Sequence, residues 1–241
     1  MSKGNFFLRG RRTVVVFVLV LAMAPLTGCL MSIQTAARNG NVAEVKKQLA
    51  LGVNPNTRTL AYRTAPLHEA ASNGRTKVVK LLLEKNADVN IRNEGGATPL
   101  HYAARHGYIK VMEILLENGA DPTQKGTGCG TPMQWAARNG QTRAIKTLMD
   151  HGVSINQRGS GGVTALMEAV SYNQVEAVKF LLANGADVNA RAENGDTALH
   201  KAHVNGKVEI GRILLEHDAD PNIEDNDGNR VPQSFIDLLR R

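Results

Sequence analysis

The chain has 241 residues, the length of one or two domains, which argues against a large multidomain enzyme. Hydrophobic residues make up 42% of the chain and charged residues 21%, which excludes a disordered chain and a membrane protein with many spans. Two cysteines are too few for a disulfide framework or a zinc cluster. The formal net charge of +7 suggests a nucleic-acid partner, so the position of the charges matters.

The first 28 residues form a separate segment. Four basic residues and no acidic residue occupy its start: Lys3, Arg9, Arg11 and Arg12. An apolar run follows at 14–24, and it is too short for the roughly 20 residues that cross a bilayer as a helix. A basic start, a short apolar run and then small residues are typical of a secretory signal peptide.

Leu26-Thr27-Gly28-Cys29 resembles the lipobox of bacterial lipoproteins. The resemblance implies cleavage after residue 28, acyl chains such as palmitate on Cys29, and a short tether at 29–32. Several acyl chains, at about 0.8 kcal/mol per buried CH₂, give a durable anchor. Leu30, in place of the aspartate that favours the inner membrane, implies the outer membrane facing the periplasm. Two alternatives are an ordinary secretory signal near Cys29 and a transmembrane anchor.

A four-residue phrase then recurs five times at intervals of 33 residues. Its copies are Ala65-Pro66-Leu67-His68, Thr98-Pro99-Leu100-His101, Thr131-Pro132-Met133-Gln134, Thr164-Ala165-Leu166-Met167 and Thr197-Ala198-Leu199-His200. The period and the T-P-L-H phrase are similar to those of the ankyrin repeat. The resemblance implies an all-α repeat solenoid of helix-turn-helix units, joined by β-hairpin or loop fingers.

Each recurring residue has a physical role in such a unit. Threonine caps the first helix, and proline suits its first turn because no N–H is needed there. Paired small residues such as Ala103-Ala104 let inner helices approach closely. A glycine, or Asn173 in one copy, ends that helix in a left-handed conformation. Asparagine and aspartate then begin a turn by bonding their own backbone.

The two ends of the repeat domain, predicted at 33–241, differ from its middle. A first unit from Ile33 to Pro55 has the paired alanines but lacks the T-P-L-H phrase. The chain closes with one predicted helix, whose Phe235, Ile236, Leu238 and Leu239 we expect to cover the last apolar face. This gives about six repeats and a C-terminal half-repeat cap. No room remains for a catalytic domain, so we expect no enzyme activity, no cofactor and no small-molecule substrate.

In the ankyrin family, partner contacts concentrate on the finger tips and on the concave positions of the inner helices, here called the palm. The palm comprises Glu69, Tyr102, Trp135, Glu168 and Lys201, then Ser72, Arg105, Arg138 and Ser171, then Asn73, His106, Asn139 and Tyr172. Tyrosine, tryptophan and arginine dominate interface energies. The predicted partner-binding residues are therefore Tyr62, Arg63, Tyr102, Arg105, His106, Trp135, Arg138 and Tyr172. The alternative is that these large side chains fill gaps between inner helices.

Charge is distributed unevenly after the predicted cleavage site. Residues 29–158 contain 17 basic and 9 acidic residues, whereas residues 159–241 contain 8 basic and 13 acidic residues. With the signal peptide removed, no continuous basic stripe is left, and we expect no nucleic-acid partner. The basic half follows the lipid anchor directly. It is either a surface that anionic lipid attracts or a solvated face without a lipid role.

Other chemical signals are weak. The histidines of the T-P-L-H phrase bond backbone in this family, so we expect no metal site. Cys129 is an inert thiol or, alternatively, the nucleophile of an enzyme or redox factor. The sequence therefore predicts a membrane-anchored scaffold in a bacterial cell envelope that binds an unknown protein partner. An inhibitor or immunity-type protein that blocks a periplasmic or incoming enzyme is the alternative.

Overall fold

The computed structural model describes residues 31–126 and 130–241. Residues 31–241 form one compact unit. The predicted signal peptide, the predicted lipid site at Cys29 and the thiol of Cys129 lie outside the described residues.

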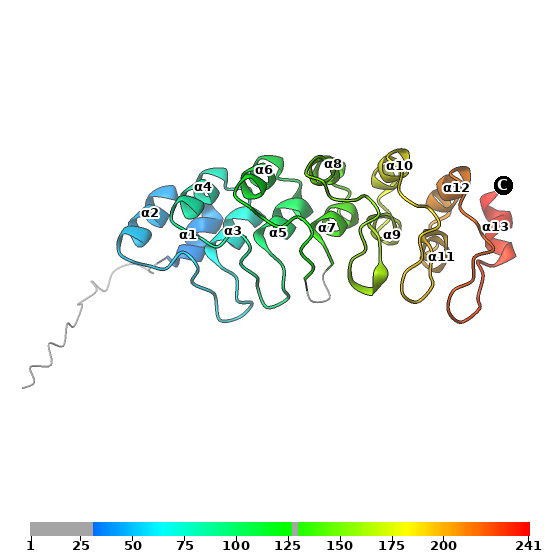
Figure 1. Ribbon diagram of the computed structural model, residues 1–241, viewed down its shortest axis with the longest axis horizontal. Helices are drawn as coiled ribbons and strands as arrows, with labels where there is room; N and C mark the ends of the chain where they lie inside the picture. The colour runs from blue at the N-terminus through cyan, green and yellow to red at the C-terminus, as the bar shows by residue number, and fades with distance from the viewer. Residues whose placement is uncertain (1–30, 127–129) are drawn as a thin grey trace, which may run out of the picture. The chain divides into compact units, whose positions relative to one another are not determined.

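Within the described residues, thirteen α-helices form six consecutive pairs and one final helix (Figure 1). The pairs are α1 (Ile33–Asn39) with α2 (Val42–Ala50), α3 (Pro66–Ser72) with α4 (Thr76–Glu84), α5 (Pro99–His106) with α6 (Ile109–Glu117), α7 (Pro132–Arg138) with α8 (Thr142–Asp150), α9 (Ala165–Ser171) with α10 (Val175–Ala183), and α11 (Ala198–Val204) with α12 (Val208–Glu216). The last helix is α13 (Gln233–Leu239). The predicted all-α solenoid of six and a half repeats is confirmed.

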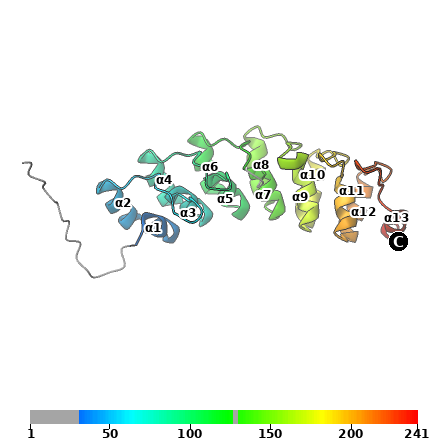
Figure 2. The same cartoon turned by 90° about the horizontal axis from the view of Figure 1, so that it is seen from below.

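The helices lie in two rows. Odd-numbered inner helices form one row, even-numbered outer helices form the other, and the fingers extend beyond the inner row (Figure 1). The view from below shows the pairs following one another in chain order (Figure 2). The fingers contain no β-hairpin among the described residues, whose β pairing is limited to an isolated bridge between Gly126 and Gly130. One finger contains a short 3-10 helix, η1 (Ser160–Gly162).

A continuous apolar core runs between the two rows. One leucine of each outer helix from α4 to α12 is fully buried, and these leucines are Leu82, Leu115, Leu148, Leu181 and Leu214. Burying a leucine side chain contributes about 1.5–3 kcal/mol. The paired alanines of the inner helices, such as Ala103 and Ala104, are also fully buried. Each repeat therefore completes its core only against its neighbours.

The turns between paired helices follow the sequence expectation. Gly107 ends α5 with a φ of +67°, and Asn173 after α9 has a φ of +59°. A Cβ atom on Gly74 would lie 2.9 Å from the ring of Tyr108, so space as well as conformation favours glycine there.

The T-P-L-H phrase joins each repeat to the next finger. The Nδ1 atom of His101 accepts a hydrogen bond from the Thr98 backbone N–H at 3.1 Å, and its Nε2 atom bonds the Gly130 carbonyl at 3.2 Å. Gln134 replaces the histidine in the next repeat, accepting from the Thr131 N–H and donating to the Val163 carbonyl. The predicted structural role of this position is confirmed.

The turns after the outer helices form a second ladder between repeats. Asp88 accepts a bond from the Asn90 N–H at 2.9 Å, which closes the predicted Asx turn. The Asn90 side chain then accepts a bond from the Asp121 N–H of the following repeat at 2.8 Å.

The C-terminal cap differs from the expectation at one position. Phe235, Ile236 and Leu239 of α13 are buried, as predicted, but Leu238 is 43% exposed. Among the described residues, the outer helix that packs on α13 is α12, and Leu238 lies on the side of α13 that stays exposed.

The buried histidines make stability depend on pH. Burial lowers the pKa of His68 and of His101 to about 4, from an ordinary value near 6.5. The unfolded chain therefore takes up protons as the pH falls below 6.5, while the folded chain does not. We expect the free energy of unfolding, measured by urea titration, to fall by roughly 2 kcal/mol for each histidine between pH 7 and pH 5.

Gln134 supplies the matched control for this prediction, because it makes the same two bonds without titrating. The double variant His68→Gln/His101→Gln should keep most of its stability at pH 7 and lose most of the pH dependence above pH 5. A double variant that is destabilised by acid as strongly as the natural chain would contradict this account.

Candidate partner-binding surface

Two aromatic rings form the centre of the palm. The rings of Tyr102 and Trp135 lie edge to face, with centroids 5.4 Å apart. Each also meets a histidine of the T-P-L-H phrase at an edge: His68 lies 5.8 Å from Tyr102, and His101 lies 5.4 Å from Trp135. Both aromatic residues are half-buried. They therefore pack between inner helices and keep part of their surface open to a partner.

The second finger, whose tip is Asn93-Glu94-Gly95-Gly96, is tied to this centre. The Nδ2 atom of Asn93 donates a hydrogen bond to the Tyr102 hydroxyl at 2.9 Å. Asn93 also closes its own loop, because its Oδ1 atom accepts a bond from the Ala97 N–H at 2.9 Å. The position of this finger and the orientation of the tyrosine ring are therefore coupled.

Three arginines extend along the palm in the same way. Each reaches from its own inner helix to the next repeat, where it meets the residue of the first palm row, which is Glu69, Trp135 or Glu168. The Nε atom of Arg38 donates to Glu69 at 2.9 Å. Arg138 donates to Glu168 with two nitrogens, at 3.1 Å each. The Arg105 guanidinium lies over Trp135 instead, 5.8 Å from the ring centroid.

This arrangement leaves one positive charge without a carboxylate. No ion pair to Arg105 occurs among the described residues, whereas Arg38 and Arg138 each pair with a glutamate. A cation over an aromatic face is attracted by about 0.5–1 kcal/mol at an exposed site, so the contact orients Arg105 without neutralising it. The centre of the palm therefore presents a positive charge beside an indole ring.

A pocket of about 250 Å³ opens at this point. It is lined by Arg105, Trp135, Arg138, Asn139 and Tyr172. The Arg138 guanidinium also covers the Tyr172 ring, 4.8 Å from its centroid, and Tyr172 is 51% exposed. Arginine forks bind carboxylates well, and the two flanking rings offer apolar contact. The pocket is thus suited to an acidic group on an otherwise apolar surface.

Four predicted residues gather at the pocket, a fifth joins them through a ring contact, and three lie elsewhere. Arg105, Trp135, Arg138 and Tyr172 line the pocket, and Tyr102 contacts Trp135. His106 is exposed and stacks on Tyr108, with ring centroids 5.7 Å apart. Partial burial and the neighbouring Arg105 lower the pKa of His106.

Tyr62 and Arg63 occupy the tip of the first finger. Tyr62 is 72% exposed, and its backbone carbonyl accepts a bond from the Glu94 N–H of the second finger at 3.1 Å. Among the described residues, no ring contact or hydrogen bond joins either residue to the pocket.

Sequence reasoning missed Arg38. It occupies in the first repeat the position that Arg105 and Arg138 hold later, and it pairs with Glu69. The first repeat lacks the T-P-L-H phrase, which defines the register of the palm positions. The 34-residue spacing between Gly40 and Gly74 was the signal that could have located it.

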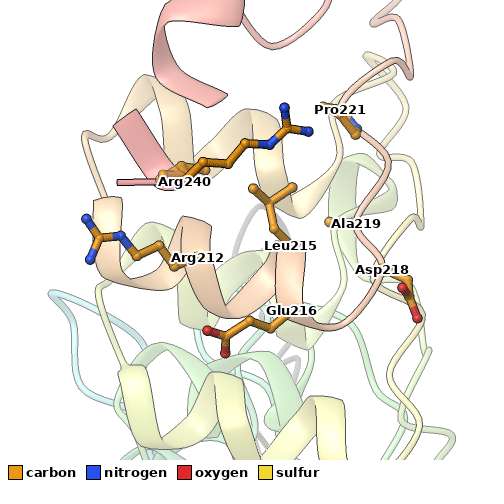
Figure 3. A pocket seen from close by; sticks show the side chains of 8 residues that line it. Arg212, Leu215, Glu216, Asp218, Ala219, Pro221 and Arg240 are labelled. Atoms are coloured by element: carbon orange, nitrogen blue, oxygen red, sulfur yellow. The ribbon is translucent and has the colours of Figure 1, made fainter. Parts of the chain in front are cut away.

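A larger opening, of about 550 Å³, lies at the C-terminal end. Leu215 points toward Arg240, and Arg212, Glu216 and Asp218 also line the opening (Figure 3). Leu239 of α13 and Arg240, which follows it, also line the opening. None of the predicted partner-binding residues lines it.

Two general features of the described residues bear on function. None of their helices has the length and apolar character that crossing a membrane requires. In the same part of the chain, no three His, Cys, Asp or Glu side chains converge as a metal site would need.

The fold and the palm define a repeat solenoid that acts as an interaction module. The family described as "Ankyrin repeats (3 copies)" matches residues 33–126, 124–192 and 162–225. The chain therefore belongs to the ankyrin-repeat family.

Solved structures show the same architecture. The ankyrin repeat domain of human ASB11 is 31% identical, with a TM-score of 0.76, covering 86% of this chain and 96% of that domain. The ankyrin repeat domain of Bcl-3 is 26% identical, with a TM-score of 0.72, covering 87% of this chain and 97% of that one.

Curated relatives match over shorter stretches. The E3 ubiquitin-protein ligase XBAT33 of Arabidopsis thaliana is 42% identical over 77 residues, which are 30% of this chain and 15% of the ligase. An ankyrin repeat-containing protein of Schizosaccharomyces pombe is 37% identical over 67 residues, or 28% of this chain and 32% of the yeast protein. The chain thus spans less than a third of these relatives, and the likeness to the ligase is limited to a short stretch of repeats.

The fluorescence of Trp135 reports directly on the palm, because it is the single tryptophan of the chain. Replacing Tyr102 with alanine removes the ring that covers one of its edges. We expect Tyr102→Ala to increase acrylamide quenching of Trp135 and to shift its emission to longer wavelengths. Lys201→Ala is the control, because Lys201 lies in the same palm row two repeats after Trp135. It should leave the quenching and the emission wavelength unchanged. Unchanged quenching in Tyr102→Ala would mean that the two rings are not in contact.

Proposed function

We propose that this protein is a membrane-anchored ankyrin-repeat lipoprotein whose palm holds a protein partner. Ankyrin-repeat domains are protein interaction modules, and the repeats fill the described chain. The observation that carries the finer proposal is the pocket of Arg105, Trp135, Arg138, Asn139 and Tyr172. It gathers the residue types that dominate interface energies at one point of the palm.

The proposed mechanism of binding is rigid presentation. Arg138 is oriented by both Glu168 and the Tyr172 ring, and Tyr102 is oriented by Asn93 and Trp135. Side chains that are already ordered lose little conformational entropy when a partner binds. The repeat stack thus lowers the cost of binding without a conformational change of its own.

The partner group that best suits the pocket is a carboxylate. No carboxylate of the described residues pairs with Arg105, whereas Glu168 already neutralises Arg138. An aspartate or glutamate side chain, or a chain terminus, would replace the solvent around Arg105 with a charge-assisted hydrogen bond.

The membrane attachment in the proposal is supported by the lipobox-like Leu26-Thr27-Gly28-Cys29 and by the basic and apolar residues before it. Cleavage at that point would leave Cys29 two residues before Met31, where the described chain begins. An acylated Cys29 would hold the repeats at the bilayer surface. Leu30 favours the outer membrane of a bacterial envelope, with the palm in the periplasm.

The proposal assigns no catalytic step to the chain. The relatives that are ligases match only a short stretch of repeats, so their activity does not carry over. An inhibitor or immunity-type protein would use the same pocket to block an enzyme. The identity of the captured partner separates that narrower function from a general scaffold.

The palm can be tested by capture of a partner from membrane extracts. We expect Tyr102→Ala/Trp135→Ala to weaken capture by at least about 30-fold, the loss that corresponds to a hot spot of about 2 kcal/mol. Tyr108→Ala is the matched control, because Tyr108 is an exposed tyrosine outside the pocket. Capture that is unchanged in the double variant, with helical circular dichroism intact, would overturn the palm as the binding surface.

The anchor can be tested by fractionation of cells that express the chain. Cys29→Ala should move the protein from the membrane fraction to the soluble fraction and abolish incorporation of labelled palmitate. Cys129→Ala removes the other cysteine of the chain and should change neither result. A Cys29→Ala protein that still carries label and still sediments with membranes would contradict the proposed lipidation.

A further inference from the structure

The tip of the first finger exposes two large apolar side chains. Leu60 is fully exposed, at 102%, and Tyr62 is 72% exposed. Two further exposed apolar residues, Met31 and Leu51, precede this tip in the chain. Half of the exposed large hydrophobic residues in the described chain therefore lie within residues 31–62.

Hydrogen bonds hold this tip in shape. The Thr59 N–H donates to the Thr64 carbonyl at 2.9 Å, and the Thr64 N–H donates to the Thr59 hydroxyl at 3.0 Å. Arg63 takes a left-handed conformation, with a φ of +51°, to close the turn. The Glu94 N–H of the next finger bonds the Tyr62 carbonyl. The loop is thus closed while Leu60 and Tyr62 stay exposed.

The other described finger tips have a different chemistry. They consist of glycine and polar residues: Asn93-Glu94-Gly95-Gly96, Ser160-Gly161-Gly162, Glu193-Asn194-Gly195 and Asn226-Asp227-Gly228. An exposed leucine and tyrosine at one tip are therefore a departure from the repeat pattern. The departure occurs at the finger that is nearest in sequence to the proposed lipid site.

The stretch of chain that contains the first finger carries basic residues only, and the exposed Glu94 of the second finger lies beside its tip. No aspartate or glutamate occurs between Glu44 and Glu69. The basic residues of this stretch are Lys46, Lys47, Arg58 and Arg63, and all four are exposed. Such a surface is complementary to a bilayer that carries anionic lipid, which attracts each basic residue near it by about 1 kcal/mol.

We infer that the first finger is a second membrane contact, which seats on an anionic bilayer. In this arrangement Leu60 enters the boundary between headgroups and acyl chains, and the Tyr62 ring lies at headgroup level, where tyrosine is enriched. Arg58 and Arg63 bind lipid phosphates. The inference rests on the proposed membrane attachment, because a two-residue tip binds weakly unless an anchor raises its effective concentration.

This contact gives the repeats a defined orientation. An acyl anchor alone, on a short tether, lets the domain rotate about one point. A second contact at the first finger removes much of that freedom and keeps the acidic last finger, Asn226-Asp227-Gly228, away from the anionic surface. The pocket around Trp135 then stays accessible to a partner.

A dye placed at the tip tests the inference without altering the two apolar residues. The full chain with Cys129→Ser and Ala61→Cys, labelled at residue 61, is reconstituted on vesicles of phosphatidylethanolamine and phosphatidylglycerol. A second protein carries the dye at Asp227→Cys on the last finger. We expect lipids with a quencher on their acyl chains to quench the dye at residue 61 several-fold more than the dye at residue 227. Leu60→Ser/Tyr62→Ser should remove the difference.

The contribution of charge is tested with matched variants. Arg58→Gln/Arg63→Gln should reduce quenching at residue 61, whereas Arg143→Gln/Arg158→Gln, which removes the same charge elsewhere, should not. Equal quenching at residues 61 and 227, or no quenching in a protein that stays on the vesicles, overturns the inference and leaves the attachment intact. If the dye at residue 61 is shielded from solvent in the absence of vesicles, the chain itself or a second copy covers the tip. This result also overturns the inference. A chain that does not stay on the vesicles contradicts the attachment and the finger contact together.

Discussion

Close packing of neighbouring inner helices is the constraint on which the rest of the structure depends. The paired alanines, from Ala36-Ala37 to Ala136-Ala137, are fully buried, and helices that meet on small side chains approach to the short end of the usual 8–10 Å. At that distance the imidazole of His101 reaches the Gly130 carbonyl of the next finger. Each repeat therefore fixes how closely the inner helix of its neighbour packs and where the finger of its neighbour lies.

The same spacing explains the chemistry of the palm. An arginine on one inner helix is long enough to meet the first palm position of the next, and Arg38 and Arg138 find glutamates there. Trp135 occupies that position opposite Arg105, so a salt bridge is replaced by a cation over a ring. A single change of residue within a regular pattern thus creates both the open charge and the apolar wall of the pocket. The proposed site follows from the repeat and required no additional element.

The helices, their turns and the structural role of the histidines could be predicted from the sequence, because they depend on residues that recur every 33 positions. Contacts that depend on how adjacent repeats align could not be predicted from the sequence. The exposure of Leu238 and the stacking of His106 on Tyr108 are contacts of this kind, because neither is set by a residue that recurs in every repeat. The sequence placed Trp135 and Arg105 on one surface, but that Arg105 covers its ring depends on the distance between α5 and α7.

The central claim is that the palm, and no other surface, holds a protein partner. Photo-crosslinking in membranes tests it most directly, with a crosslinking amino acid placed at Ser171 on the palm or at Lys179 on the outer helix α10. The account predicts one discrete crosslinked product from position 171, none from position 179, and loss of the product when Trp135 is replaced with alanine. The same product from position 179, or a product at 171 that survives the loss of Trp135, would contradict it.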